Sequence, residues 1–237
     1  MDADTAVLFP DSFDESEIGK IPSGWNGRNI GDLAHIRHGF AFKGEFFRTE
    51  PTSDVLLTPG NFAIGGGFKA DKFKYYEGPV PEDFILRDGD LLVTMTDLSK
   101  MGDTLGYPAI VPRTREVRFL HNQRLGKVEL KANAGIGTAF LYQTFCLPAY
   151  RHHVLGSASG STVKHTSPDR IKAFEVPVPD EEVATVFERA TSSLQGRLVA
   201  NVNESETLAA LRDTLLPRLL SGEIRVADAE RTVEEVV

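Results

Sequence analysis

The sequence DEEVATVFERATSSLQGRLVANVNESETLAALRDTLL, residues 180–216, determines the architecture of this chain more than any other stretch. It contains no proline and a single glycine, and its three opening acids suit the positive N-terminal end of a helix. Apolar residues recur at spacings of three and four, as on one face of a helix: Val183, Phe187, Ala190, Leu194, Leu198 and Val202. The pattern predicts one helix of about 37 residues, about 55 Å long.

A helix of this length exceeds what the domain before it needs to cover its core. Helices much longer than about 25 residues are typical of coiled coils or of struts that bind a partner. We therefore expect a coiled coil in which the apolar stripe packs against a partner, with a helix lying across its own domain as the alternative. Pro217 is expected to end or kink this helix, and Ser221-Gly222 to stop it.

The residues before the helix mix helical and strand-like segments. Asn29 as an N-cap and the apolar stripe after it predict a helix as far as Gly39, and Ser167-Pro168 predicts the start of a short helix. A longer helical segment, 138–154, is interrupted near Pro148. The segments expected to form strands are 84–86, 90–95, 107–111, 126–130 and 175–178. Because these elements show no regular βαβ repeat, the expected fold class is α+β.

The chain is expected to have four parts. They are an extended acidic lead-in at 1–20, one mixed α/β domain at 21–179, the long helix at 180–222 and an acidic tail at 223–237. The start of the chain does not have the features of a signal peptide, and no apolar run approaches the ~18 residues of a membrane span. We therefore expect a cytoplasmic protein that does not contact a membrane.

The charge of the chain is distributed unevenly. The formal net charge is −8, and residues 1–19 and 180–237 each carry −6, which leaves +4 for residues 20–179. The sharpest basic cluster consists of Arg113, Arg115, Arg118, Arg124 and Lys127. Such a cluster is either a solvated surface or a strip that faces the phosphates of a nucleic acid.

The sequence lacks the motifs of several common enzyme sites. It has no phosphate-binding loop, no H-E-x-x-H zinc helix, no G-x-S-x-G nucleophile turn and no Asn-Pro-Pro-aromatic motif of adenine methyltransferases. Glu129-Leu130-Lys131 has the E-x-K form of a metal-dependent nuclease, with Asp103 as a further acid, but so short a pattern often arises by chance. Cys146, the single cysteine, excludes an internal disulfide. We therefore expect no catalytic activity, no cofactor and no metal.

Several segments resemble the specificity subunits of type I restriction-modification systems. The matching segments are Ile21-Pro22-Ser23-Gly24-Trp25, Gly89–Thr96 with Gly106–Ala109, His121–Val128, Gly160–His165, Val176–Pro179 and Leu215–Val226. Each piece alone is moderately specific, whereas their order and spacing together are a strong indication. The resemblance covers about residues 8–226.

The resemblance implies a protein that recognises DNA but has no catalytic activity. In this family a target-recognition domain reads one half of a split site in double-stranded DNA. The long helices hold two such domains apart and dock the DNA adenine methyltransferase subunits, and a restriction motor subunit can join the complex. The present sequence contains a single recognition domain and helix, where typical members contain two. It therefore resembles a half-subunit, the product of a split gene or a fragment, and these three alternatives stay open.

Candidate DNA contacts follow from residue type and position. Gly160–His165 combines a glycine, two hydroxyls and a lysine, which suits phosphate contacts, although a structural turn explains it equally well. The candidates are Lys43, Asn61, Thr96, Lys100, Arg113, Arg115, Arg124, Ser161, Thr162, Lys164 and His165. Phe40, Phe42, Phe46 and Phe47 are expected in the core, because duplex DNA exposes few base faces for stacking.

The apolar stripe of the long helix suggests a partner of its own kind. A second copy packed antiparallel about a two-fold axis would cover the stripe and form a homodimer. Two identical recognition domains would then require a palindromic split site. A different hypothesis is a protein-interaction module that binds a methyltransferase or a half-subunit without reading DNA, and the negative net charge gives it modest support.

Overall fold

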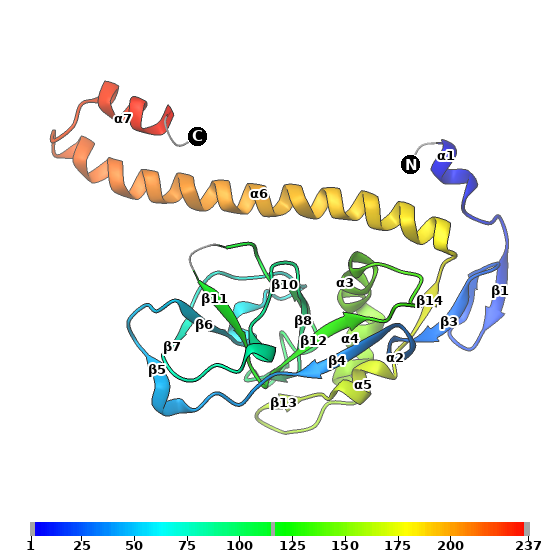
Figure 1. The fold of residues 1–237 in the computed structure, drawn as a ribbon. Helices are drawn as coiled ribbons and strands as arrows, with labels where there is room; N and C mark the ends of the chain where they lie inside the picture. Colours follow the sequence, from blue (N-terminus) through cyan, green and yellow to red (C-terminus); the bar gives the residue numbers. More distant parts are fainter. Residues whose placement is uncertain (1–2, 115–116, 235–237) are drawn as a thin grey trace. The chain divides into compact units, whose positions relative to one another are not determined.

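The computed structural model describes residues 3–114 and 117–234, except for the side chains of residues 3, 4, 195, 198–200, 202, 203 and 206. The chain divides into two compact units, residues 1–189 (unit 1) and residues 190–237 (unit 2). Figure 1 shows the order of the helices and strands along the chain.

Unit 1 is built on two four-stranded sheets. The first has the strand order β10-β8-β12-β4 and is antiparallel throughout. The second has the order β11-β6-β7-β5, in which β11 runs parallel to β6 and the other pairs are antiparallel. The strands are β4 (Ala34–His38), β5 (Phe47–Arg48), β6 (Asp54–Leu57), β7 (Lys74–Tyr76), β8 (Leu91–Thr94), β10 (Pro108–Ile110), β11 (Arg118–His121) and β12 (Leu125–Leu130).

Three two-stranded pairs and five helices complete the named α and β elements described in unit 1, before the start of the long helix. The pairs are β1 (Phe13–Ser16) with β2 (Gly19–Pro22), β3 (Asn26–Asn29) with β14 (Glu175–Val178), and β9 (Thr96–Asp97) with β13 (Lys164–His165). The helices are α1 (Ala3–Val7), α2 (Ile30–Leu33), α3 (Thr138–Cys146), α4 (Pro148–Gly156) and α5 (Pro168–Lys172). The architecture is the expected mixture of helices and mainly antiparallel strands, so the predicted α+β class is confirmed for unit 1.

Strand β8 is buried on both faces, and it divides the core into two layers. Leu91 and Val93 belong to a cluster that includes Phe145 of α3 and side chains of α4 and α5. Leu92 points the other way and joins a cluster with Val55 of the second sheet. A strand covered on both faces needs apolar residues on both, so this segment shows no polar alternation.

The predicted helix from Asn29 to Gly39 is wrong beyond its first turn. Residues Ile30–Leu33 form the single turn α2, and the chain then extends into β4. Within β4, Ala34 and Ile36 are buried whereas the other residues are exposed. This alternation with period two fits a strand, and the pairing along β12 stabilises that conformation instead of a helix.

Most of the other predicted elements of unit 1 are confirmed. The strands expected at 90–95, 107–111, 126–130 and 175–178 appear as β8, β10, β12 and β14. The interrupted helix appears as α3 and α4, and Ser167 caps α5 by accepting a hydrogen bond of 3.3 Å from the backbone N–H of Arg170. The strand expected at 84–86 is wrong, because Glu82–Phe84 is a 3₁₀ turn and Ile85 forms only an isolated bridge to Leu120.

The acidic lead-in is not simply extended. Residues 3–22 contain α1 and the β1–β2 hairpin, in which Phe13 lies opposite Pro22. The aromatic rings of Phe9 and Trp25 lie 6.5 Å apart, so the residues on either side of the hairpin contact one another. The lead-in is therefore a short helix followed by a paired hairpin, and not a single extended segment.

The long helix α6 runs from Glu181 to Leu220, 40 residues and therefore about 60 Å. Pro217 neither ends nor visibly interrupts it, since a proline in the last turn removes a single backbone donor near the end of the helix. The expected acidic tail is instead α7 (Val226–Glu234), which turns back beside the end of α6 within unit 2 (Figure 1). None of the helices in the described residues combines the length and apolar composition that a membrane span requires.

Candidate nucleic-acid interface

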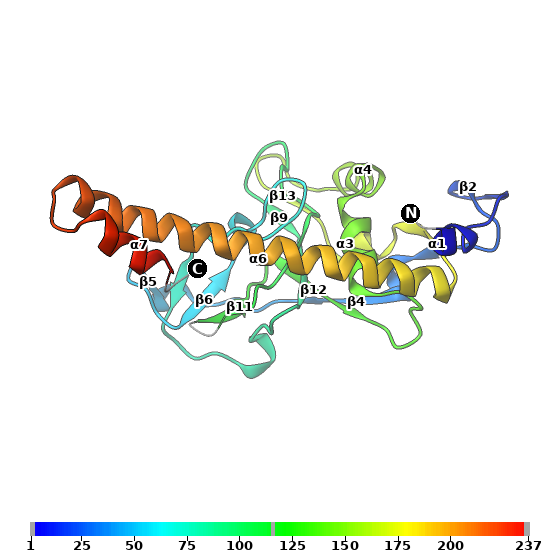
Figure 2. The same ribbon diagram turned by 90° about the horizontal axis from the view of Figure 1, so that it is seen from above.

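Two segments far apart in the sequence meet at the short antiparallel pair β9–β13. Lys164 lies opposite Asp97, and His165 opposite Thr96. The pairing continues through a hydrogen bond of 3.0 Å from the Thr166 N–H to the Met95 carbonyl. It brings together residues 98–107, which follow β9, and residues 157–163, which precede β13. We call these two segments, together with β9 and β13, the loop pair, and Figure 2 shows its two strands side by side.

Asp97 anchors the first segment of the loop pair. One carboxylate oxygen accepts a hydrogen bond of 2.6 Å from the Ser99 N–H, and the other accepts from the N–H and the hydroxyl of Thr104. Burial of Asp97 raises its pKa, but these hydrogen bonds outweigh the burial and leave the pKa below its usual value. The ionised carboxylate therefore ties both ends of the turn together.

Arg151 of α4 holds the same segment from the helix side. Its guanidinium donates hydrogen bonds to the carbonyl oxygens of Gly102 and Leu105. It also lies 4.5 Å from the centroid of the Tyr107 ring, a distance at which a cation is attracted to the face of an aromatic ring. The backbone of the first segment is thus fixed before any ligand arrives.

The second segment of the loop pair is a tight turn closed on itself. Ser159 and His165 exchange backbone hydrogen bonds of 3.0 and 2.9 Å. Gly160 has a φ of +92°, and a Cβ there would collide with the carbonyl oxygen of Val163. Only glycine fits this position, and the turn leaves Ser161 and Thr162 exposed.

The loop pair presents donors and apolar groups on one surface. Its exposed or half-exposed side chains include Leu98, Lys100, Met101, Asp103, Ser161, Thr162, Lys164 and His165. Within the described part of the chain, neither Lys100 nor Lys164 lies within ion-pair distance of a carboxylate. Unpaired ammonium groups and hydroxyls are the donors that contact phosphates and base edges. Six of the predicted DNA contacts lie in the loop pair. Thr96 is the buried one, and its hydroxyl oxygen lies 3.1 Å from the Nδ1 of His165.

Two members of the basic cluster at 113–127 are neutralised by carboxylates. Arg118 binds Asp54 through two hydrogen bonds of 2.6 and 2.7 Å, and Lys127 lies 2.8 Å from Asp90. Of the predicted contacts in this cluster, Arg113 is exposed and Arg124 half-buried, while Arg115 lies outside the described residues. The backbone of Arg124, however, lies beside the β9–β13 pair, because its carbonyl oxygen accepts a hydrogen bond of 2.8 Å from the Met95 N–H.

Asn61 has a structural environment that does not suit base reading. Its side chain is 0% exposed. Its carbonyl oxygen accepts from Thr58, and its amide nitrogen donates to the carbonyl oxygens of Lys69 and Asp71. We therefore withdraw Asn61 from the interface. Lys43 is exposed and lies 3.8 Å from Glu45, in the separate segment that leads into β5.

The sequence analysis missed three residues that form or support the loop pair. Leu98 and Met101 are exposed at its surface, and Arg151 supports it from α4. One signal in the sequence could have indicated Leu98 and Met101. They flank a lysine in the gap between the matching segments Gly89–Thr96 and Gly106–Ala109. No local pattern distinguishes Arg151 from other helical arginines.

Two residues of the nuclease hypothesis have other partners. Glu129 lies 3.3 Å from Arg37, and the Lys131 ammonium donates to the Gly31 carbonyl. The described residues contain no cluster of three or more side chains suited to hold a metal ion. Burial raises the pKa of the Cys146 thiol to about 11, so at neutral pH it is protonated.

The start of the long helix is attached to unit 1. Val183 is buried, and the ring of Phe187 lies 6.2 Å from that of Phe140. The Glu188 carboxylate accepts hydrogen bonds of 3.0 and 3.2 Å from the Ala139 N–H at the start of α3. Of the other predicted stripe residues, Ala190 and Leu194 are exposed, and the side chains of Leu198 and Val202 lie outside the described part of the chain.

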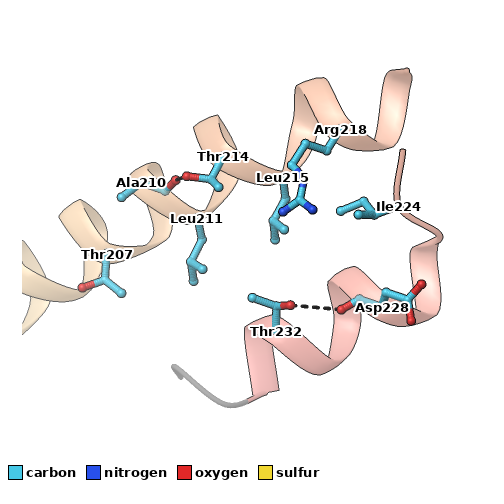
Figure 3. A pocket seen from close by; sticks show the side chains of 9 residues that line it. All are labelled: Thr207, Ala210, Leu211, Thr214, Leu215, Arg218, Ile224, Asp228 and Thr232. Carbon is cyan, nitrogen blue, oxygen red and sulfur yellow. Dashed lines mark hydrogen bonds between the residues drawn. The ribbon is translucent and has the colours of Figure 1, made fainter. Parts of the chain in front are cut away.

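Unit 2 contains a hollow between the end of α6 and α7 (Figure 3). Its volume is about 540 Å³, and its lining is mostly hydroxyl and apolar side chains. Leu211, Leu215 and Ile224 form the apolar part, whereas Arg218 carries the positive charge. The helical hairpin is thus loosely filled on the side where α7 returns.

The curated relatives that match this chain are specificity subunits of type I restriction enzymes. A scan against known protein families finds no match. The chain is 22% identical over 220 residues to the Type I restriction enzyme EcoBI specificity subunit of Escherichia coli, covering 91% of this chain and 43% of that protein. It is 31% identical over 86 residues to the HindI specificity subunit of Haemophilus influenzae, covering 36% of this chain and 19% of that protein.

Solved structures give a corresponding match of fold. The S subunit of a type I restriction-modification system from M. genitalium has a TM-score of 0.57 at 18% identity, over 84% of this chain and 46% of that one. A chain from a structure of the type I R-M system has a TM-score of 0.51 at 15% identity, over 90% and 47%. The chain therefore spans less than half the length of these relatives.

Proposed function

We propose that this chain, whose resemblance to type I restriction specificity subunits is confirmed, is a non-catalytic protein that recognises a DNA sequence. Its unit 1 would read one half of a bipartite site through the loop pair. The methyl transfer and the cleavage would belong to partner subunits, a DNA adenine methyltransferase and a restriction motor. The chain itself would need no cofactor or metal.

The observation that carries this proposal is the β9–β13 pairing. Thr96 and His165 come from separate segments, each of which resembles specificity subunits in sequence. The pairing brings both segments into one surface with two lysines that, among the described residues, have no carboxylate within ion-pair distance. A surface of fixed backbone, free donors and exposed hydroxyls suits DNA contacts, since phosphate contacts set the position and base contacts set the specificity.

The long helix supports a second part of the proposal. Leu194 is 64% exposed, and the sequence predicts that its apolar stripe continues along α6. Apolar stripes that stay uncovered favour association. We propose that a second copy covers it in an antiparallel homodimer, which would give the pair of recognition domains a palindromic split site. We propose that the same helix also docks the methyltransferase subunit.

A binding selection on the full chain tests the DNA part. Randomised duplexes bound by the purified chain are amplified and sequenced over several rounds. We expect an enriched bipartite motif. The variant Lys100→Ala with Lys164→Ala should bind more weakly and should lower the slope of log affinity against log salt by up to about two units, because each phosphate contact contributes about 0.9.

A matched control and the contrary outcome complete the test. Lys20→Ala with Lys69→Ala removes two exposed lysines that are paired with Glu15 and Asp71, and it should leave the slope unchanged. If the wild-type chain enriches no motif, or if the loop-pair variant keeps the wild-type slope, the loop pair does not read DNA. Retained binding to a methyltransferase would then favour the protein-interaction module.

A further inference from the structure

Two large apolar side chains are exposed on the first segment of the loop pair. Leu98 is 64% exposed and Met101 is 76% exposed. Isolated exposed apolar residues are common and carry little information. These two, however, flank the unpaired Lys100 in a turn whose backbone is fixed at several points, so their position at the surface has a structural cause.

The fixed backbone explains why these side chains are not buried in unit 1. The N–H groups of Ser99 and Thr104 are bound by Asp97, and the N–H of Asp103 donates 2.8 Å to the Ser99 hydroxyl. These three backbone N–H groups of the turn are thus engaged internally. Leu98, Lys100, Met101 and Asp103 are its exposed side chains, and Leu98 and Met101 are the apolar ones among them.

The chemistry of this surface points to one apolar partner in DNA. The edges of base pairs in the major groove present one apolar group, the 5-methyl of thymine, among donors and acceptors. Lys100 and Lys164 supply the donors for guanine or phosphate oxygens that lie beside such a group. An apolar wedge inserted between base pairs from the minor groove would also use exposed Leu or Met. The hydroxyls and lysines around them favour the reading of base edges.

We propose that Met101 and Leu98 form an apolar contact that reads a thymine 5-methyl group in the recognised half-site. The inference rests on the proposed function, because it requires that the loop pair faces DNA. It assigns specificity to side chains without a hydrogen-bonding group. The base preference would thus come in part from apolar contact.

Replacement of thymine by uracil isolates the methyl group. Duplexes carrying the motif selected by wild type are synthesised with each thymine replaced in turn by uracil, and their dissociation constants are measured. At one or more positions the wild type should lose about four-fold in affinity, the effect expected for one buried methyl group. Met101→Ala or Leu98→Ala should weaken binding to the thymine duplex and become insensitive to uracil at that position.

Two further variants control for folding and for general loss of apolar surface. Met101→Leu keeps an apolar side chain and should retain most of the sensitivity to uracil. Ile64→Ala removes an apolar side chain that is 71% exposed outside the loop pair, and it should behave like wild type. Thermal unfolding of all variants checks that the fold is retained.

The outcomes separate this inference from the proposed function. If wild type selects a motif but tolerates uracil at every thymine, the inference is wrong and the proposed function stands. The same holds if the Met101 and Leu98 variants keep the full uracil effect. If wild type selects no motif, the proposed function fails, and the inference fails with it. Normal DNA binding with lost methyltransferase binding would assign the apolar pair to a protein contact.

Discussion

His121 shows how burial determines the behaviour of a single residue. It is 2% exposed, and its Nε2 lies 3.0 Å from the carbonyl oxygen of Leu125. Burial lowers its pKa to about 4, outweighing the hydrogen bond to Leu125, which raises the pKa; the charges of Lys127 and Arg37 add to the lowering. The neutral imidazole is therefore a structural hydrogen-bonding group at physiological pH, although its segment is among those that resemble the family.

The lowered pKa of His121 predicts a loss of stability in acid. The folded state holds this histidine neutral, so between its usual value of 6.5 and about 4 the unfolded state binds more protons. The free energy of unfolding should fall across this interval, by up to about 3 kcal/mol from this group. Urea denaturation of wild type and His121→Gln at a series of pH values measures the effect, and the variant should show the shallower dependence.

Asp97 makes a matched control necessary. Its pKa is lowered, so its stabilising contribution is also lost as the pH falls through the value in the folded state. His152→Gln replaces an exposed histidine and should keep the wild-type pH dependence. An unchanged slope in His121→Gln would mean that His121 does not carry the acid sensitivity.

At the scale of elements, the start of α6 is fixed by a contact with α3. The Glu188 carboxylate binds the Ala139 N–H, where the positive end of the α3 dipole and its unsatisfied donors favour an anion. Gly137 leaves the space for it, since a Cβ there would collide with the carboxylate. A side chain of one helix thus serves as the N-terminal cap of another.

Replacement of Glu188 should loosen this attachment. Glu188→Ala removes the cap of α3, and we expect a loss of about 1 kcal/mol in the free energy of unfolding of unit 1. Glu182→Ala removes an exposed acid in the first turn of α6 and should cost less. Hydrogen exchange at the first turn of α3 provides a local measurement. Equal effects of the two variants would contradict a specific role for Glu188.

At the scale of the whole molecule, the proposed homodimer can be tested by mass. Light scattering across micromolar concentrations should give wild type about twice the monomer mass of 26.0 kDa. Leu194→Asp would bury an unpaired charge in the antiparallel interface, at a cost of about 3 to 5 kcal/mol. The variant should therefore be a monomer. The exposure of Leu194 on the apolar stripe that the sequence predicts is the reason for expecting association.

A neighbouring position gives the control for that substitution. Ser193 is exposed and adjacent to Leu194 but off the stripe, so Ser193→Asp adds the same charge and should leave the dimer intact. A monomeric wild type would rule out the homodimer and, with it, the palindromic site. Recognition of DNA by unit 1 would be unaffected by that result.

The sequence by itself determined the features that depend on neighbours along the chain. The spacing of apolar residues predicted α6, Ser167 predicted the start of α5, and the alternation around Val128 predicted β12. These patterns reflect local periodicity and capping, which a short window contains. The short windows failed after Asn29, where a helical spacing and a strand alternation coincide over a few residues.

Tertiary structure alone decided which distant groups meet. The pairing of Asp54 with Arg118 neutralised one charge of a cluster that looks basic in sequence, and the β9–β13 pair joined two segments into one surface. The support of that surface by Arg151 likewise depends on where α4 packs. Such contacts join residues tens of positions apart, and burial and hydrogen bonding of the whole fold select them, so no local window of the sequence specifies them.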